Sequence, residues 1–329
     1  FELLRMTGLR PFVKSLASLP FSSLVQMMLQ HTCTLYSLIK VETTALPPSQ
    51  GHTHQKKCFR AALLWAITGG MSRDDAVRFY AKWSTLFPSL DEEECIDEDG
   101  PEAITPLIAC LQAVGVDIAT ARTTLDSGRG LTVPTIEGTA LIWLILALTR
   151  GRIPTMLVGP RFSGKSTLMS SSLESLISSG DVTGMTTLHC DVATDARSIQ
   201  RVFEGRLTRR AGGRLGPSGN SVSAAPLLFF VEDLQLGVCD SSNGTARSAD
   251  ELLRQWVEYG FWYIRPSLAG MWKSEDSDNG PHPNDLLNSE TAGRNTIVDA
   301  MFTVTLSSQG EYYFFLINHL MTLLYFVTD

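Results

Sequence analysis

The octapeptide Gly159-Pro160-Arg161-Phe162-Ser163-Gly164-Lys165-Ser166 decides the fold expected for this sequence. It fits the pattern G-x-x-x-x-G-K-[ST] in full. The glycines in this pattern let backbone N–H groups point inward as a nest for phosphate oxygens, and the next helix adds its positive N-terminal end. The flanks also fit, because the apolar residues 155–158 predict a strand and residues 168–177 predict a helix. We therefore predict a phosphate-binding loop between a strand and a helix.

The polar residues of this loop have expected roles. Lys165 places a compact charge on the outer phosphates, and Ser166 offers a hydroxyl to Mg²⁺. The alternative interpretation is a chance Gly-Lys-Ser turn. The nucleotide contacts are expected from Gly159, Pro160, Arg161, Phe162, Ser163, Gly164, Lys165, Ser166 and Thr167.

A pair of carboxylates follows a second apolar run. Residues 227–231 are entirely apolar, as in a parallel strand that is covered on both faces, and Glu232 and Asp233 come directly after them. We expect Glu232 to lie near the metal ion and Asp233 to polarise the attacking water. The usual order is Asp and then Glu, and a displacement of about 1 Å can cost on the order of 100-fold in rate. Binding should tolerate this order better than hydrolysis does, and an acidic strand end without metal is the alternative.

The rest of the chain divides into a helical part and an alternating part. Residues 1–88 show helical spacing of apolar side chains, interrupted by a loop at 47–54. From about residue 131, strands and helices alternate, which predicts an α/β layered domain. Further elements are expected as a strand at 186–190, a helix at 198–210 and a packed helix at 312–327, the last being short for a membrane span.

Composition excludes several classes of protein. The 329 residues are 44% hydrophobic and 19% charged, which excludes wholesale disorder, and the formal charge of −7 argues against binding nucleic acid through the overall field. The six cysteines form no C-x-x-C pair, so their spacing gives no support to a zinc site. The acidic run at 91–102 is interpreted as a solvated loop, and Phe1 in place of Met indicates a fragment or an incomplete gene model.

Several stretches resemble the motor region of dynein heavy chains, namely the end of the second AAA+ module and most of the third. Val133-Pro134-Thr135 resembles the V-P-T segment that lines the adenine in that family. The block Glu251-Leu252-Leu253-Arg254-Gln255-Trp256 resembles its diagnostic E-L-L-R-Q-W. The remaining likenesses lie at residues 154–166, 230–236 and 260–263, at Gly293-Arg294-Asn295, and upstream at 8–13 and 63–70.

The resemblance implies a P-loop NTPase AAA+ domain of the α/β class, with a three-layer parallel-sheet core preceded by an all-α lid. The implied division is a helical lid of the preceding module at 1–130, the large nucleotide-binding domain at 131–306, and the start of its own lid at 307–329. The implied cofactors are ATP or ADP with Mg²⁺, and the function is an ATP-binding module that regulates ATP-driven movement along microtubules. The alternatives are a structural module that binds nucleotide without hydrolysis and another AAA+ remodelling ATPase.

The family also implies partners and a place in the cell. The partners are neighbouring AAA+ modules of the same chain, dynein intermediate and light chains, and microtubules through parts outside this sequence, with no nucleic acid and no membrane. The expected location is the cytoplasm and cytoskeleton, with the E-L-L-R-Q-W form leaning towards the axoneme of cilia or flagella.

Three departures from the family pattern bear on hydrolysis. Glu232 replaces the expected Asp, residues 271–290 allow no assignment of the polar sensor, and residues 296–302 lack the arginines that reach a neighbouring nucleotide. An arginine finger is worth roughly 10³ to 10⁵ in rate. The expectation is therefore either that the neighbouring site does not hydrolyse nucleotide or that the gene model has mis-joined exons.

Other polar and aromatic residues receive structural interpretations. Arg206, Arg209 and Arg210 are interpreted as a solvated helix face, with a phosphate-facing patch as the alternative. His189 is expected to be packed or exposed, with a metal or nucleophile site beside Cys190 and Asp191 as the alternative. The aromatic residues Trp256, Trp262 and Tyr263 are assigned to the core and to packing between modules.

Overall fold

The computed structural model describes residues 21–42, 51–69, 73–86, 106–116, 135–218, 225–238, 248–264, 293–307 and 324–327. The chain divides into two compact units. The first comprises residues 1–175, 307–314 and 324–329, and the second comprises residues 176–306 and 315–323.

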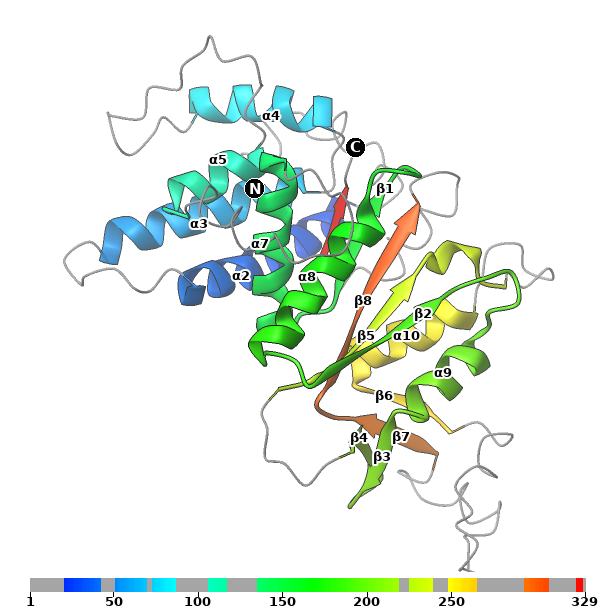
Figure 1. Ribbon diagram of the computed structural model, residues 1–329. Coiled ribbons are helices and arrows are strands. Elements are labelled where there is room, and N and C mark those ends of the chain that lie inside the picture. Colours follow the sequence, from blue (N-terminus) through cyan, green and yellow to red (C-terminus); the bar gives the residue numbers. More distant parts are fainter. Residues whose placement is uncertain are drawn as a thin grey trace, which may run out of the picture. The chain divides into compact units, whose positions relative to one another are not determined.

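The described part of the first unit consists of helices and two strands, and it includes the connection from β1 to α8 that carries the loop (Figure 1). Cys110 Sγ donates a hydrogen bond to Ala61 O at 3.4 Å and thereby joins two of these helices through a buried contact. The helices are α2 (Phe21–Glu42), α3 (Gly51–Thr68), α4 (Arg73–Leu86), α5 (Pro106–Ala113), α7 (Ile136–Arg150) and α8 (Lys165–Ser179). The strands are β1 (Thr155–Gly159), which is buried along its whole length, and β9 (Leu324–Val327), which pairs with β1 in parallel.

In the residues that the structure describes, the second unit contains strands of two sheets, the helices α9 and α10 and a short 3₁₀ helix. Its elements are β2 (Gly184–His189), α9 (Ala196–Glu204), β3 (Leu207–Arg210), β4 (Arg214–Pro217), β5 (Leu227–Glu232), the short 3₁₀ helix η4 (Leu234–Leu236), α10 (Ser248–Tyr259), β6 (Phe261–Tyr263), β7 (Arg294–Ile297) and β8 (Ala300–Ser307). Strands β2, β5 and β8 pair in parallel in that order, and a second sheet has the order β3-β4-β7-β6.

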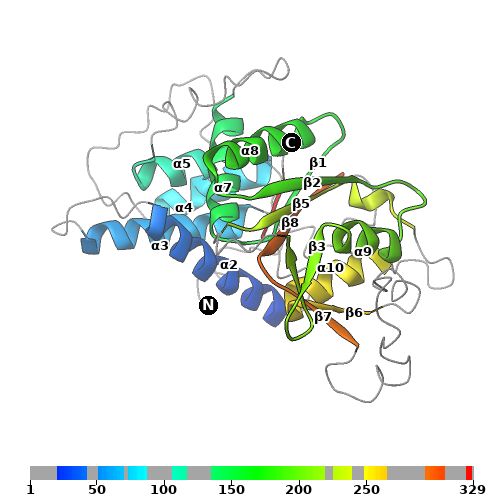
Figure 2. The ribbon, with the colours of Figure 1, turned by 60° about the horizontal axis from the view of Figure 1, so that its bottom comes forward.

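The core of the second unit lies where α9 and α10 pack together, side by side in both ribbon views (Figure 1, Figure 2). Its central contacts join rings from helices and strands, with centroid distances of 4.2 Å for Phe203 and Phe229 and 4.9 Å for Trp256 and Phe302. The ring centroid of Trp262, on β6, lies 5.3 Å from that of Trp256. The assignment of Trp256 and Trp262 to the core is therefore confirmed, whereas Tyr263 is half exposed.

The α/β class with parallel strands is confirmed, as are the strands predicted at 155–158 and 227–231 and the helix predicted at 168–177. The strand predicted at 186–190 is β2, which begins two residues earlier, at Gly184, and ends at His189. Within the described residues, no helix has both the length and the apolar character needed to cross a membrane.

Three predicted elements are wrong in part. The helix predicted at 198–210 ends at Glu204, because Gly205 caps it with its N–H on Arg201 O, and residues 207–210 form β3 instead. Residues 324–327 form a strand rather than the end of a packed helix, while 312–323 lie outside the described residues. Helix α3 begins at Gly51, so the last four residues of the loop predicted at 47–54 are helical. The division at 1–130, 131–306 and 307–329 stays a prediction.

Candidate nucleotide-binding site

The phosphate loop joins β1 to α8 in the first unit. Its backbone takes the left-handed conformation twice, at Phe162 with φ 66° and at Gly164 with φ 78°. Glycine suits the second position because a left-handed backbone strains residues that carry a side chain. The backbone conformation alone explains this preference, since a Cβ on Gly164 would meet no atom within 4 Å. Phe162 takes this strained conformation with its ring fully exposed. The sequence therefore forms an open, tightly turned strand-to-helix connection.

Lys165 lies inside this loop and not in bulk solvent. Its side chain is 8% exposed, and its ammonium donates to Pro160 O at 2.6 Å, which closes the loop on itself. Ser166, the second residue of α8, is half-buried, and Thr167 is exposed. An ammonium, a hydroxyl and a helix N-terminus at one bend fit the charge and the oxygens of a phosphate chain with its Mg²⁺.

Thr135 lies at the start of α7. Its hydroxyl accepts a hydrogen bond from Gly138 N at 3.0 Å and so caps that helix. A Cβ on Gly138 would lie 3.7 Å from Leu168 Cδ1, so the first turn of α7 lies next to α8. Val133 and Pro134 lie outside the described residues, and the adenine contact expected from all three stays a prediction.

Glu232 lies at the end of β5 in the second unit, opposite the end of β2. In the parallel register it pairs with His189, and its Oε2 lies 2.7 Å from His189 Nδ1. The Glu232 side chain is 16% exposed and that of His189 is 75% exposed. His189 was expected to be either packed or exposed, and the structure shows that it is exposed. Its contact with Glu232 was not predicted. The contact depends on β2 lying beside β5 in the register that pairs their last residues, which the sequence pattern did not reveal.

Asp233 follows β5 in a left-handed conformation, with φ 54° and ψ 44°. Asp tolerates this conformation better than most residues. Its N–H donates to Thr305 Oγ1 at 3.4 Å, and its Oδ1 accepts from Gln235 Nε2 at 3.0 Å. The carboxylate is thus held at a sharp turn directly after the strand.

Cys190 and Asp191 behave as structural residues. Burial raises the pKa of the Cys190 thiol to about 12, with further increases from the negative charges of Asp191, Asp233 and Asp250. A hydrogen bond from the Thr194 hydroxyl lowers the pKa of Asp191. Cys190 is therefore a neutral thiol and a poor nucleophile or metal ligand. Across the described ranges, no group of three or more His, Cys, Asp or Glu side chains could hold a metal ion.

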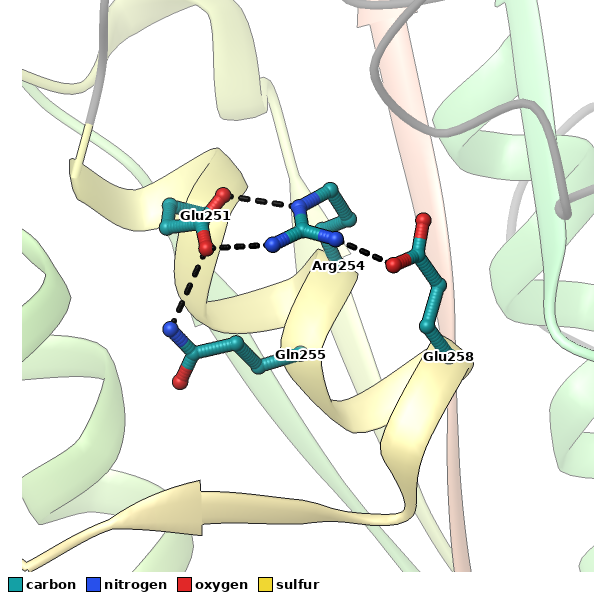
Figure 3. A network of polar contacts seen from close by, with 4 residues as sticks. All are labelled: Glu251, Arg254, Gln255 and Glu258. Carbon is teal, nitrogen blue, oxygen red and sulfur yellow. Dashed lines mark hydrogen bonds and ion pairs between the residues drawn. The ribbon is translucent and has the colours of Figure 1, made fainter.

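The E-L-L-R-Q-W block lies on α10 and stabilises that helix. Arg254 makes two hydrogen bonds to Glu251, at 2.6 and 2.8 Å, and also contacts Glu258, while Gln255 donates to Glu251 at 3.1 Å (Figure 3). The hydrogen bonds of Arg254 to Glu251, and then its contact with Tyr259, raise the pKa of the Arg254 guanidinium. Leu252, Leu253 and Trp256 are buried. The diagnostic block therefore builds the fold of the second unit.

The three arginines interpreted as a helix face lie beyond the end of α9. Arg210 Nη1 is 2.8 Å from Asp299 Oδ2, and Arg206 and Arg210 line an open cavity of about 290 Å³ with Asp299. Gly184 and Leu227, the first residues of β2 and β5, also line this cavity, so it lies at the opposite end of the strands from Glu232. Arg209 is exposed on β3.

Comparison with known proteins shows which proteins the chain is similar to. Residues 126–274 match the family model described as the P-loop containing dynein motor region. The chain is 26% identical over 241 residues, or 68% of its length, to the dynein beta chain of the flagellar outer arm of Chlamydomonas reinhardtii. It is 26% identical over 286 residues, or 79% of its length, to human dynein axonemal heavy chain 9. It is 30% identical over 133 residues, or 40% of its length, to human dynein axonemal heavy chain 2.

The matches confirm the resemblance to dynein motor regions that the motifs indicated. The chain spans only 5%, 6% and 3% of the length of these three relatives, respectively. The family match covers the phosphate loop, Glu232-Asp233 and the E-L-L-R-Q-W block, and it ends before Gly293-Arg294-Asn295. In the structure Asn295 is buried, and its side chain donates to Glu204 Oε1 at 3.1 Å.

Proposed function

Because residues 126–274 match a P-loop containing dynein motor region, we propose that this chain is the ATP-binding AAA+ region of a dynein heavy chain. Its nucleotide state would regulate ATP-driven movement along microtubules. The observation that carries the proposal is the loop between β1 and α8, in which Lys165 is buried against Pro160 O at 2.6 Å. A cation preplaced inside such a loop suits the β- and γ-phosphates of a nucleotide.

Each residue of the proposed site has a role that its chemistry supports. The backbone from Gly159 to Thr167 binds the phosphates, and Lys165 neutralises the charge on the outer ones. Ser166 and Glu232 would supply oxygens to Mg²⁺, and Asp233 would orient the attacking water and accept its proton. The metal, when bound, neutralises the charge that develops on the phosphate oxygens. Val133, Pro134 and Thr135 would line the adenine.

The setting of the site follows from the same family. The proposed division is a helical lid at 1–130, the nucleotide-binding domain at 131–306 and the start of the next lid at 307–329. The proposed partners are neighbouring AAA+ modules, intermediate and light chains, and microtubules through other parts of the protein. The names of the relatives, which are flagellar and axonemal, support the axoneme as the location.

A binding measurement on Lys165→Ala tests the proposal. The charge-assisted bonds of one lysine are worth about 2–3 kcal/mol, so the affinity for a fluorescent ATP analogue with Mg²⁺ should fall by roughly 30- to 150-fold. Lys56→Ala is the matched control, because Lys56 is an exposed lysine on α3. Undiminished affinity in Lys165→Ala, with the control also unchanged, would defeat the assignment.

A second candidate function is a module that binds nucleotide without turnover. The order Glu232-Asp233 favours it, because the water-activating carboxylate is one methylene shorter than the usual Glu and the hydrolysis geometry tolerates little displacement. The two candidates share the binding site and differ in the role of Asp233.

A further inference from the structure

The His189–Glu232 contact joins the last residues of two neighbouring strands. The strands run in parallel from the Gly184–Leu227 pair to the His189–Glu232 pair, and Cys190 N donates to Glu232 O at 2.9 Å directly after it. Strand β2 therefore holds Glu232 at its backbone and, through the 2.7 Å contact with His189, at its carboxylate.

The direction of this hydrogen bond follows from its chemistry. An ionised carboxylate only accepts hydrogen bonds, so Nδ1 of His189 must carry the proton and donate it. The bond occupies Oε2 of Glu232 and leaves Oε1 for a further ligand. The imidazole of His189, which donates the hydrogen bond, is largely exposed, whereas the carboxylate of Glu232, which accepts it, is mostly shielded from water.

Glu232 needs such a restraint more than an Asp would. A glutamate has one more rotatable bond than an aspartate, so holding its carboxylate in one place costs more conformational entropy. Partners that hydrogen-bond metal-binding carboxylates orient them, and their loss typically weakens metal binding by 10- to 100-fold.

We propose that His189 is a positioning residue that orients the Glu232 carboxylate towards Mg²⁺ and so offsets the extra methylene of Glu at this position. This inference rests on the proposed function, in which Glu232 lies near the metal of the bound nucleotide. In this proposal His189 acts through its contact with Glu232 and not as a ligand of the nucleotide or the metal.

The test measures how Mg²⁺ concentration governs the binding of a fluorescent ATP analogue to the chain, at one constant pH. His189→Ala should raise the Mg²⁺ concentration for half-maximal tight binding about 10-fold. Its affinity for the analogue in EDTA should stay unchanged. His189→Asn should restore most of the loss, because the Asn side-chain N–H lies close to where Nδ1–H was. Val192→Ala, an equally exposed change nearby, should match the original chain.

A double variant sharpens the test. Shortening the carboxylate by Glu232→Asp moves it out of reach of His189, so adding His189→Ala to Glu232→Asp should change the Mg²⁺ dependence little further. The inference is overturned if His189→Ala keeps the original Mg²⁺ dependence, if the Asn variant behaves like the Ala variant, or if the two changes add fully. The proposed function fails separately, when the original chain and Lys165→Ala bind the analogue equally.

Discussion

The indole Nε1 of Trp262 donates a hydrogen bond to Oε1 of Glu204 at 2.7 Å, and both side chains are buried. The same oxygen accepts from Gln200 Nε2 at 2.8 Å and from Asn295 Nδ2 at 3.1 Å. Glu204 ends α9, Trp262 lies on β6 and Asn295 lies on β7. One carboxylate therefore ties a helix to two strands that come from distant parts of the sequence.

Replacing Glu204 should cost much of the stability of the chain. Glu204→Ala leaves the buried donors of Trp262 and Asn295 without their acceptor, whereas Gln200 Nε2 keeps its bond to Tyr263 O. At about 1–3 kcal/mol for each unpaired donor, the free energy of unfolding should fall by at least about 2 kcal/mol. Glu204→Gln keeps an acceptor oxygen and loses only the charge assistance, so it should cost about 1–2 kcal/mol. Urea unfolding followed by circular dichroism measures both. Equal losses in the two variants would contradict a role for the shared oxygen.

The fold of the second unit was predictable where one local signal dominated. The apolar run at 227–231 predicted β5 correctly, as the pattern at 159–166 predicted the strand-to-helix loop in the first unit. The helix predicted at 198–210 ran too far, because Gly205 stops α9 and the left-handed Gly212 and Gly213 turn the chain into a hairpin. Both signals were in the sequence, and the arginine-rich composition of the segment concealed them.

The candidate site was predictable residue by residue but not contact by contact. The pattern alone identified Lys165, but its bond to Pro160 O depends on the curvature of the loop. The partner of Glu232 depends on which strand lies beside β5 and in which register, and this is a tertiary property. Likewise, the resemblance of Gly293-Arg294-Asn295 to the family pattern did not reveal that the Asn295 side chain joins a buried hydrogen-bond network.

The Cys190 thiol should resist alkylation in the folded protein. Its pKa of about 12, against an ordinary value of 9.0, leaves roughly one molecule in 1,000 ionised at pH 9, and only the thiolate reacts. Cys33 is exposed and serves as the internal control. Mass spectrometry after brief iodoacetamide treatment at pH 9 should find Cys33 modified and Cys190 intact, with both modified in urea. Equal rates for the two cysteines in the folded protein would contradict the buried placement.

The raised pKa of Cys190 also makes the free energy of unfolding depend on pH. Because the folded pKa of Cys190 lies above the unfolded value, its contribution to the free energy of unfolding is fully present below about pH 9 and is lost as the pH rises towards 12. The loss of stability on raising the pH should therefore be smaller in Cys190→Ala than in the original chain.

Asp233→Asn separates turnover from binding. Asn tolerates the left-handed backbone that Asp233 adopts at φ 54°, so the variant should keep its fold and its affinity for ATP. It cannot accept a proton from water, and losing a general base costs about 10² to 10⁴ in rate, so single-turnover phosphate release in the protein with its neighbouring modules should fall at least about 100-fold. The melting temperature and the affinity for the analogue are the controls. Unchanged phosphate release in Asp233→Asn would remove the enzymatic role and leave the module that binds nucleotide without turnover.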